Sequence, residues 1–475
     1  EVANLVEFPT LAIGRIDEDF LKLPREVLVT AMGMHQRYFA MEDAQGRLVP
    51  RFGVVSNTRV PNMDAVVRGY ERVLAARLYD ARFFYRNDLD TGLESMGNRL
   101  GERLFLKGAG TMGEKATRLA RLAGLLADAF QTGAAVRADA QRAALLCKAD
   151  LMSAMVGEFP ELQGVMGAYY AVARDERTEV ADAIREHYLP RFAGDDLAPS
   201  PAGAVLAVAD RIDSVVTCFC AGAIPTGSKD PLALRRQAIG LLKTVIDRRF
   251  PGSDLEGLLT RAESCQPQPL TEECREAVLG FMMERFLGIL TAEYEVPSDF
   301  ANAVLAAEGV RFAEPHTITA RALDLADFSA GTEGFRDFLA NVFKRVDNIL
   351  KKADTDAPGW REQALERGLL GTAADGVKRD CRSSLREDAE IAVEQVRMAA
   401  FDDVVAAGKS GKYAAMLDRL YGFKDPLARF FGSGQDGVPV LVCSDPVLRV
   451  ARLALLERVL RLFTGFADFS KISTR

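Results

Sequence analysis

Several features that would quickly reveal a function are missing from this 475-residue sequence. No apolar run approaches the roughly 18 residues that a membrane-spanning helix needs. No basic stretch followed by an apolar one opens the chain, so no secretory signal is visible. Only three histidines occur, His35, His187 and His316, and none of them precedes an aspartate. We therefore expect no membrane partner and no His-Asp metal-binding pair.

Cysteine is present seven times but forms no Cys-x-x-Cys pair. These scattered residues, odd in number, favour free thiols in a reducing cytoplasm over a disulfide framework or a zinc site. The formal net charge of −7 does not indicate nucleic-acid binding by the chain as a whole. Local clusters of lysine and arginine can still bind phosphates, because such contacts depend on where the cations lie.

The pattern of apolar residues predicts a mainly α fold with a small β-containing N-terminal remnant. Short β-rich runs occur at VLVTAM (27–32), QRYFAME (36–42) and RFGVVSN (51–57), and DAQGR (43–47) predicts a hairpin turn between the last two. From about residue 61 onward, apolar residues recur at the three- and four-residue spacing of helices.

The composition and the positions of proline and glycine predict further boundaries in the chain. Asp230 followed by proline predicts the capped start of a long helix. The apolar, strand-like opening at Glu1 suggests that a natural N-terminal region has been cut away. We expect four parts, at residues 1–60, 61–260, 261–330 and 331–475.

Two stretches, AALLCKAD (143–150) and AVLAVADRID (204–213), resemble the metal-binding helices of the HD phosphohydrolase superfamily. That site needs a histidine, an adjacent His-Asp pair and a later aspartate, which together hold an ion that activates water. Here Cys147-Lys148 occupies the pair, and Asp210 alone is retained. Lys148 would put a positive charge where the ion should lie. The competing interpretations are a buried, small apolar role for Cys147 and a structural ion pair or cap for Asp210.

Other catalytic motifs are absent or incomplete. Gly408-Lys409-Ser410 matches the end of a phosphate-binding loop, but that loop needs glycine at position 403, where Asp403 stands. The nucleophile elbow and the HExxH metalloprotease motif are missing. We predict no catalytic residue and no metal ligand in this chain.

The sequence resembles one family closely, the β-subunit of the bacterial heterotetrameric glycyl-tRNA synthetase. The most specific part is IPTGSKDPLALRRQAIGLLK (224–243), in which a Gly-Ser turn leads into Lys-Asp-Pro and a pair of arginines. Tyr70 interrupts one stretch, and 265–330 and 355–440 match loosely. The other stretches that carry the resemblance are 32–57, 147–171, 188–199, 207–216, 338–352 and 445–470.

The resemblance implies a tRNA-binding subunit of glycine–tRNA ligase in an α2β2 assembly, with glycine tRNA as the substrate. The α-subunit would carry the aminoacylation site and use ATP and Mg²⁺, so this chain would bind no cofactor, membrane or DNA. Residues 1–60 would be the C-terminal part of a B3/4-like module. Residues 61–260 would form a degenerate HD-type domain, 261–330 a helical linker, and 331–475 an anticodon-binding domain of the DALR type. A metal-dependent HD phosphohydrolase and a pure assembly scaffold remain alternatives.

The stretch FRDFLANVFKRVDNILKK (335–352) is the main candidate for an RNA contact. Its apolar residues follow one helical face, as in a helix that packs on a core. An ordinary solvated face is the alternative to a cationic stripe that follows a tRNA backbone or reads unpaired bases. The candidates on the opposite side are Lys344, Arg345, Asn348, Lys351 and Lys352, with Tyr413, Arg419 and Tyr421 as weaker ones.

A second cationic group stands before and within the long helix that follows Asp230. Lys229, Arg235 and Arg236 lie near a helix N-terminus, where positive side chains are not favoured by the helix dipole. A bound phosphate would compensate their charge and meet the free N–H groups. Pairing with nearby aspartates, such as Asp230, is the equally weighted alternative.

Overall fold

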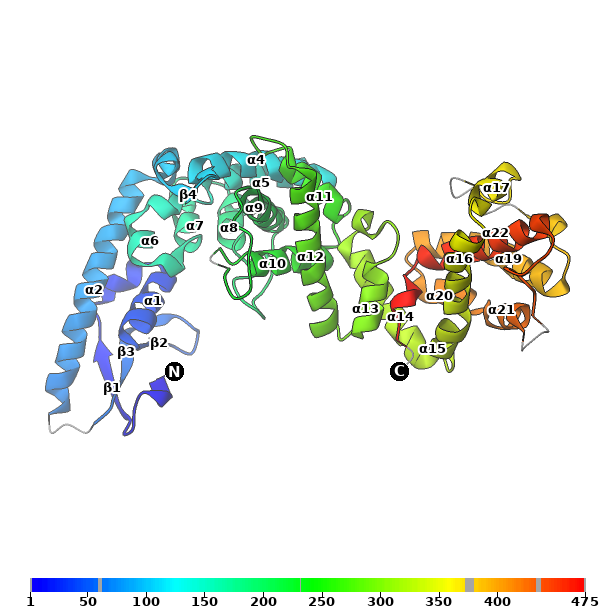
Figure 1. The fold of residues 1–475 in the computed structure, drawn as a ribbon. Coiled ribbons are helices and arrows are strands. Elements are labelled where there is room, and N and C mark those ends of the chain that lie inside the picture. Colours follow the sequence, from blue (N-terminus) through cyan, green and yellow to red (C-terminus); the bar gives the residue numbers. More distant parts are fainter. Residues whose placement is uncertain (1, 59–61, 231, 372–379, 433–436, 474–475) are drawn as a thin grey trace. The chain divides into compact units, whose positions relative to one another are not determined.

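The computed structural model describes residues 2–58, 62–230, 232–371, 380–432 and 437–473 (Figure 1). The chain forms two compact units, one of residues 1–244 with 258–278, the other of residues 245–257 with 279–475. Most described residues are helical and the longer strands lie near the N-terminus, so the predicted mainly α fold with a small N-terminal sheet is confirmed. The expected boundaries at residues 60 and 330 fall inside these units, and the four-part division stays a prediction.

Among the described residues, the first unit contains five strands and nine complete α-helices. Its strands are β1 (Thr10–Arg15), β2 (Phe39–Glu42), β3 (Leu48–Ser56), β4 (Leu104–Leu106) and β5 (Gly110–Thr111). Its helices are α1 (Arg25–Gln36), α2 (Met63–Thr91), α3 (Leu93–Asn98), α4 (Met112–Ala129), α5 (Ala134–Leu146), α6 (Ala154–Glu158), α7 (Val165–Val172), α8 (Thr178–Glu186) and α9 (Pro201–Cys220). Three helices have residues in both units: α10 (Leu234–Arg248), α11 (Leu255–Glu263) and α12 (Glu272–Ala292).

The N-terminal sheet is antiparallel, with the strand order β1-β3-β2. The predicted hairpin turn is confirmed: the Asp43 N–H donates to the Arg47 carbonyl, and Gly46 adopts a φ of +75°. The β-strand predicted at VLVTAM is wrong, because these residues lie in α1. Val27, Leu28, Ala31 and Met32 are buried, and this three- and four-residue spacing is that of a helix packed on the sheet.

Close packing in this sheet leads to a paired prediction. A methyl group at Gly14 of β1 would overlap the buried ring of Phe52 on β3. Gly14→Ala should therefore lower the free energy of unfolding by about 1–3 kcal/mol, the usual cost of overpacking. Gly33→Ala in α1 meets nothing within 4 Å and should raise it by about 0.5–1 kcal/mol. Urea unfolding of both variants tests this, and a neutral Gly14→Ala would contradict the packing.

The helical body of the first unit is built around α9, in which all residues from 202 to 219 are buried. The Ser200 hydroxyl accepts from the Gly203 N–H at 3.0 Å, and Pro201 follows it at the first helical position. Helix α4 begins with a capping box, in which Thr111 and Glu114 bond reciprocally to each other's N–H groups. Helices α4, α5 and α8 pack against α9, and this arrangement brings charged side chains from several helices together.

All the regular secondary structure described in the second unit after α12 is helical, with loops and turns between the helices. Residues 335–356 run as α15 (Phe335–Phe338), a π-helical turn (Leu339–Phe343) and α16 (Lys344–Asp356). The other helices are α13 (Ser298–Leu305), α14 (Pro315–Gly331), α17 (Trp360–Glu366), α19 (Asp388–Lys409), α20 (Tyr413–Tyr421), α21 (Lys424–Phe431) and α22 (Pro446–Thr464).

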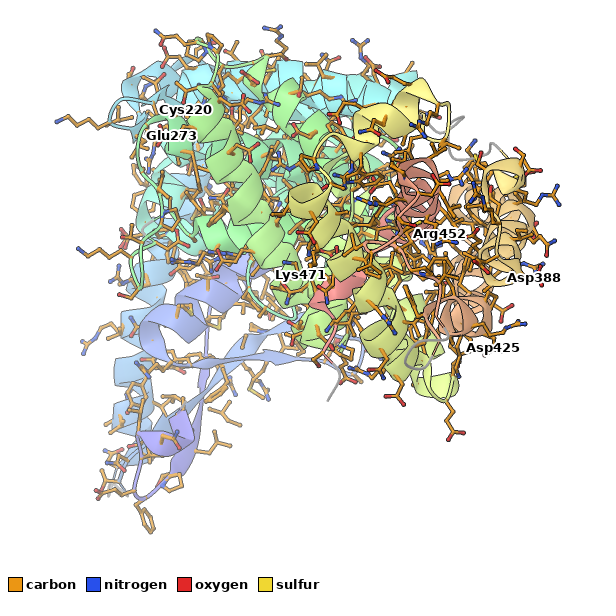
Figure 2. All side chains as sticks on the ribbon, turned by 45° about the vertical axis from the view of Figure 1, so that its right-hand side comes forward. Cys220, Glu273, Asp388, Asp425, Arg452 and Lys471 are labelled. Atoms are coloured by element: carbon orange, nitrogen blue, oxygen red, sulfur yellow. The ribbon has the colours of Figure 1, made fainter. Side chains whose placement is uncertain are left out.

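Helices α19 and α22 of this unit carry buried charges that pair with each other. Arg452 Nε donates to Glu390 Oε2 at 2.6 Å, and both side chains are almost wholly buried. In Figure 2, Arg452 lies among the C-terminal helices, whereas the exposed Asp388 and Asp425 lie at the edge of the unit. Gly408-Lys409-Ser410 lies at the C-terminal end of α19. Carbonyl groups point outward there, so the match to a phosphate-binding loop was a chance one.

The described residues contain neither a membrane-spanning helix nor a cluster of metal ligands. None of the helices found there is long and apolar enough to cross a membrane. No group of three or more His, Cys, Asp and Glu side chains that could hold a metal ion occurs among the same residues. All seven cysteines lie in the described residues, and none of them forms a disulfide.

Candidate functional site

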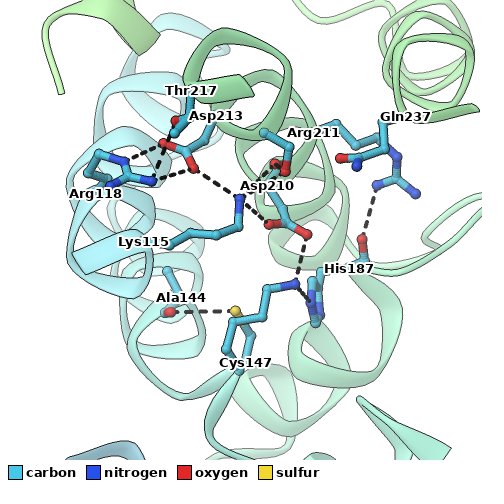
Figure 3. Close-up of polar contacts among 12 residues, drawn as sticks. Lys115, Arg118, Ala144, Cys147, His187, Asp210, Arg211, Asp213, Thr217 and Gln237 are labelled. Carbon is cyan, nitrogen blue, oxygen red and sulfur yellow. Dashed lines mark hydrogen bonds and ion pairs between the residues drawn. The ribbon is translucent and has the colours of Figure 1, made fainter. Parts of the chain in front are cut away.

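A buried cluster of charged side chains lies where α4, the end of α5 and α9 meet (Figure 3). Helix α4 contributes Lys115 and Arg118, one turn apart. Lys148 follows the end of α5, and α9 contributes Asp210 and Asp213, again one turn apart. Each side chain therefore comes from a helix that is fixed by packing, and the cluster is held rigidly.

Two ammonium groups flank the carboxylate of Asp210. Lys148 Nζ lies 2.8 Å from Oδ2, and Lys115 Nζ lies 2.9 Å from Oδ1. Burial alone would raise the pKa of Asp210, but the two lysines outweigh it and hold the pKa well below its usual range. Asp210 is therefore ionised, and it makes the structural ion pair that the sequence analysis weighed against a metal-ligand role.

Asp213 forms the second half of the cluster. Its carboxylate accepts from Lys115 at 2.9 Å and from Arg118 Nε at 2.8 Å. The Gln266 side-chain amide donates to it at 3.3 Å. Lys115 thus bridges both aspartates of α9, and its removal would leave both short of one cationic partner.

Three neutral side chains, those of His187, Cys147 and Tyr188, lie beside Lys148. His187 Nδ1 lies 2.7 Å from the Ile184 carbonyl and donates to it, so Nε2 is free to accept from Lys148 at 2.8 Å. Burial and then the charge of Lys148 lower the pKa of His187 well below its ordinary value. Burial raises the pKa of Cys147 to about 12, so its thiol stays protonated. The ring of Tyr188 lies 4.1 Å from Lys148 Nζ, close enough for a cation–π contact.

This donor set does not fit a divalent metal ion. A metal ligand needs a free lone pair and room for the cation, but two ammonium groups lie within 3 Å of the Asp210 carboxylate and His187 Nε2 accepts from one of them, that of Lys148. Lys148 fills the space with a fixed positive charge, as the sequence predicted, and Cys147 is fully buried as expected. Lys115, Arg118 and His187 were not predicted from the sequence. Lys115 and Arg118 are in helical phase with the buried Leu119, Leu122 and Leu126 of α4, a signal that would have placed them on its buried face.

A neighbouring carboxyl group gives a pH-dependent prediction. Burial raises the pKa of Asp150 from 3.8 to about 6, although the N–H groups of Gly164 and Gly167 donate to Oδ2. Because the pKa is raised in the folded state, the folded protein binds an extra proton between about pH 4 and 6. The stabilisation is full below that range and is lost as the pH rises through 6.

Asp150→Asn keeps an acceptor oxygen without the ionisation. Relative to the unmodified protein, its free energy of unfolding should rise by about 2–3 kcal/mol between pH 4 and pH 7.5, which is the value of two pKa units. Urea unfolding of both proteins at the two pH values measures this difference. Parallel pH profiles would show that Asp150 does not titrate in this range.

The predicted apolar face of 335–352 is confirmed, since Phe335, Phe338, Phe343, Val346 and Leu350 are buried. The π-helical turn within this stretch was not predicted. Turns of this kind often occur at functional sites.

The cations of α16 are partly engaged within the unit. Lys344 Nζ donates to the Ile472 carbonyl at 2.9 Å, and the Arg345 guanidinium lies 4.7 Å from the Phe431 ring. Lys351 pairs with Asp347 at 2.6 Å and Lys352 with Asp356 at 3.9 Å, both about two-thirds exposed. Asn348 is exposed. Lys344 thus anchors the helix, whereas Arg345, Asn348, Lys351 and Lys352 lie at the surface.

The weaker candidates of this unit are bound by their neighbours. Tyr413 is buried, the Tyr421 hydroxyl donates to the Glu333 carbonyl, and Arg419 pairs with Asp403. These contacts agree with the packing and rim roles weighed for them.

In the second cationic group, Arg235 is paired with a carboxylate, whereas Lys229 and Arg236 are exposed. The Asp230 carboxylate accepts from the N–H groups of Leu234 and Arg235, and it also pairs with the Arg235 guanidinium at 3.9 Å. It thus caps α10, although this helix begins at Leu234 and not directly after Asp230 as predicted. The N–H groups expected to meet a phosphate are therefore already occupied. Lys229 is exposed in the preceding turn. Arg236 is exposed, and it donates only to the carbonyl of Arg191 at 3.1 Å.

Comparison with known proteins identifies the family. A family model described as "Glycyl-tRNA synthetase beta subunit" matches residues 1–306. The chain is 40% identical over its whole length to the "Glycine--tRNA ligase beta subunit" of Syntrophotalea carbinolica, and covers 64% of that protein. The protein of the same name from Coxiella burnetii is 39% identical, with the same coverage. That from Geobacter sulfurreducens is 42% identical over 91% of this chain and 58% of its own length.

The chain belongs to the glycyl-tRNA synthetase beta-subunit family. The resemblance seen in the sequence motifs is thus confirmed. The part matched by the family model contains the whole cluster around Asp210. The similarity to the Syntrophotalea and Coxiella beta subunits extends further, over α16 and α22. The chain spans about 64% of the length of these two relatives.

Proposed function

We propose that this chain is the tRNA-binding β-subunit of glycine–tRNA ligase. It would act with an α-subunit that attaches glycine to its tRNA. The observation that carries this proposal is the similarity to named beta subunits along the whole chain. Two lysine ammonium groups lie beside Asp210, where a catalytic metal ion would have to bind. This arrangement is consistent with a binding role.

Within this proposal, the first unit contains a degenerate HD-type domain. Lys115, Lys148 and Asp210 come together from α4, the end of α5 and α9. Lys148 stands where the HD superfamily has the aspartate of its His-Asp pair. The ammonium groups replace an ion as the partners of Asp210, so the core keeps its packing without hydrolytic chemistry. The phosphohydrolase alternative receives no support from this geometry.

The second unit would supply the anticodon-binding domain, with α16 as its RNA-facing helix. Exposed Arg345, Lys351 and Lys352 would contact phosphates, and Asn348 would donate to base edges of an unpaired loop. Lys351 and Lys352 are about two-thirds exposed in their pairs with Asp347 and Asp356. Exposed ion pairs stabilise a protein by less than about 1 kcal/mol, so a phosphate would compete with these carboxylates for the two lysines. Lys229 and Arg236 would extend the cationic surface in the first unit, with Arg235 held by Asp230.

The remaining parts of the proposal concern the assembly. The α-subunit would bind ATP and Mg²⁺, two copies of each chain would form the α2β2 enzyme, and the enzyme would act in the cytoplasm. Residues 1–60 would complete a B3/4-like module.

Reconstitution tests this proposal. The purified chain is mixed with the α-subunit from the same organism, and attachment of glycine to tRNA is measured for each chain alone and for the mixture. Glycylation by the mixture alone is the expected result. Copurification with the α-subunit without any tRNA affinity would instead indicate an assembly scaffold, and the absence of both would overturn the proposal.

A further inference from the structure

A wide cleft opens above the buried cluster in the first unit. Its volume is about 1180 Å³, and its lining comes from α1, the β4–α4 region, the loop before α7, the loop after α8, α9 and the start of α10. Lys115, Lys148, His187 and Asp210 reach its floor. Pockets of roughly 300–1,000 Å³ hold ligands of drug size, so this cleft has room for a whole nucleotide.

The lining of this cleft is cationic, although the chain as a whole is acidic. Seven lysine and arginine side chains line it against three aspartate and glutamate side chains, while the whole chain has a net charge of −7. A concave surface that concentrates one sign of charge focuses the electrostatic potential and attracts ligands of the opposite sign. The expected ligand is therefore an anion.

Three arginines at the cleft are oriented by main-chain carbonyls. Arg103 donates to Leu151 O at 3.0 Å, Arg191 to Glu161 O at 3.4 Å, and Arg236 to Arg191 O at 3.1 Å. In the part of the chain that the structure describes, none of these three pairs with a carboxylate. A carbonyl fixes the direction of a guanidinium without neutralising its charge. A phosphate would supply that charge and accept two parallel N–H bonds from one guanidinium.

An aromatic ring stands next to these cations. Phe192 lines the cleft directly after Arg191, and its side chain is 62% exposed. A second ring of the lining, that of Phe105, lies 4.8 Å from Lys115 Nζ. Large exposed aromatic side chains beside arginines are the surfaces on which unpaired bases stack. A simple inorganic anion would leave Phe192 and most of the cleft volume unused.

We propose that this cleft binds a nucleotide, with its phosphoryl group held by Arg103, Arg191 and Arg236 and its base on Phe192. The nucleotide is either free or an unpaired residue of an RNA, because both present the same chemistry. This site is separate from the tRNA contacts proposed for α16. Binding of an RNA residue there rests on the proposed function, whereas binding of a free nucleotide does not.

Fluorescence titration of the full chain with a methylanthraniloyl-labelled ADP tests the free form, and titration with a labelled single-stranded hexa-adenylate tests the RNA form. The double variant Arg103→Gln/Arg236→Gln should lower the affinity for at least one of the two probes by about tenfold or more, since two charge-assisted contacts are removed. The control Arg47→Gln/Arg99→Gln removes two exposed arginines of the same unit, each paired with a nearby carboxylate outside the cleft. It should leave both probes unchanged.

Further variants separate the parts of the site. Phe192→Ala should weaken binding of the labelled nucleotide, but inorganic pyrophosphate should still displace it. Charge reversal on α16 should weaken tRNA binding and leave binding of the labelled ADP unchanged. A wrong assignment of the cleft and a wrong proposed function therefore give different results. Loss of ADP binding in the cleft variant identifies a free nucleotide, and loss of the hexa-adenylate alone identifies RNA. The proposal is overturned if neither probe binds, or if both bind the cleft variant as tightly as the control, with circular dichroism showing that both variants are folded.

Discussion

Replacing Asp210 with alanine should lower the free energy of unfolding by about 3–5 kcal/mol. The change leaves the ammonium groups of Lys115 and Lys148 buried without their shared carboxylate, and removing one member of a buried ion pair costs that much. Lys148 keeps neutral His187 and the ring of Tyr188 as its direct contacts, and neither carries a compensating negative charge. The measurement is the urea midpoint of the whole chain at pH 7.5.

Two further variants make this prediction specific. Asp128→Ala removes an exposed carboxylate that pairs with Arg137 at 3.2 Å, and it should cost less than about 1 kcal/mol. Adding Lys148→Met to Asp210→Ala removes the stranded charge and should recover a large part of the loss, which a double-mutant cycle measures. Equal effects of Asp210→Ala and Asp128→Ala would contradict the ion-pair interpretation.

Charge reversal on α16 should weaken tRNA binding strongly. The triple variant Arg345→Glu/Lys351→Glu/Lys352→Glu removes three cations without touching Lys344, which anchors the helix to the Ile472 carbonyl. If each residue neutralises one phosphate, the slope of log affinity against log salt should fall by about 2–3, and the affinity at low salt by roughly tenfold or more. Filter binding with glycine tRNA over a range of salt concentrations measures both.

The control for this variant has the same change in charge at exposed positions elsewhere in the second unit. Lys409→Glu/Lys412→Glu/Arg429→Glu alters three exposed cations of α19, the α19–α20 turn and α21. A loss of affinity shared equally by the two triple variants would reflect net charge alone. Unchanged affinity and salt slope in the α16 variant would show that this face does not meet tRNA.

Much of this architecture could be predicted from local sequence signals. The hairpin at DAQGR and the apolar face of 335–352 depend on neighbouring residues, and both are confirmed. Asp230 does cap the long helix, but that helix begins at Leu234, three residues later than predicted. A structural ion pair was one of the roles weighed for Asp210, and its partners are Lys148 and Lys115. The family could be inferred because its motifs are spread along most of the chain.

The features that were missed depend on tertiary packing. VLVTAM has the residue types of a strand, yet it packs as a helix because its apolar residues meet the N-terminal sheet at helical spacing. Lys115 lies 95 residues before Asp210, and no local pattern states that the two helices carrying them are neighbours. The cleft could not be foreseen either, since its arginines come from distant segments and are oriented by main-chain carbonyls.

The most direct test of the central proposal is a capture experiment. The chain is immobilised, total tRNA from a bacterial cell is passed over it at moderate salt, and the retained RNA is sequenced. We expect glycine isoacceptors to be enriched over all other tRNAs, and the α16 triple variant to lose that enrichment. Indifferent retention of every tRNA, or none at all, would contradict a recognition role for this chain.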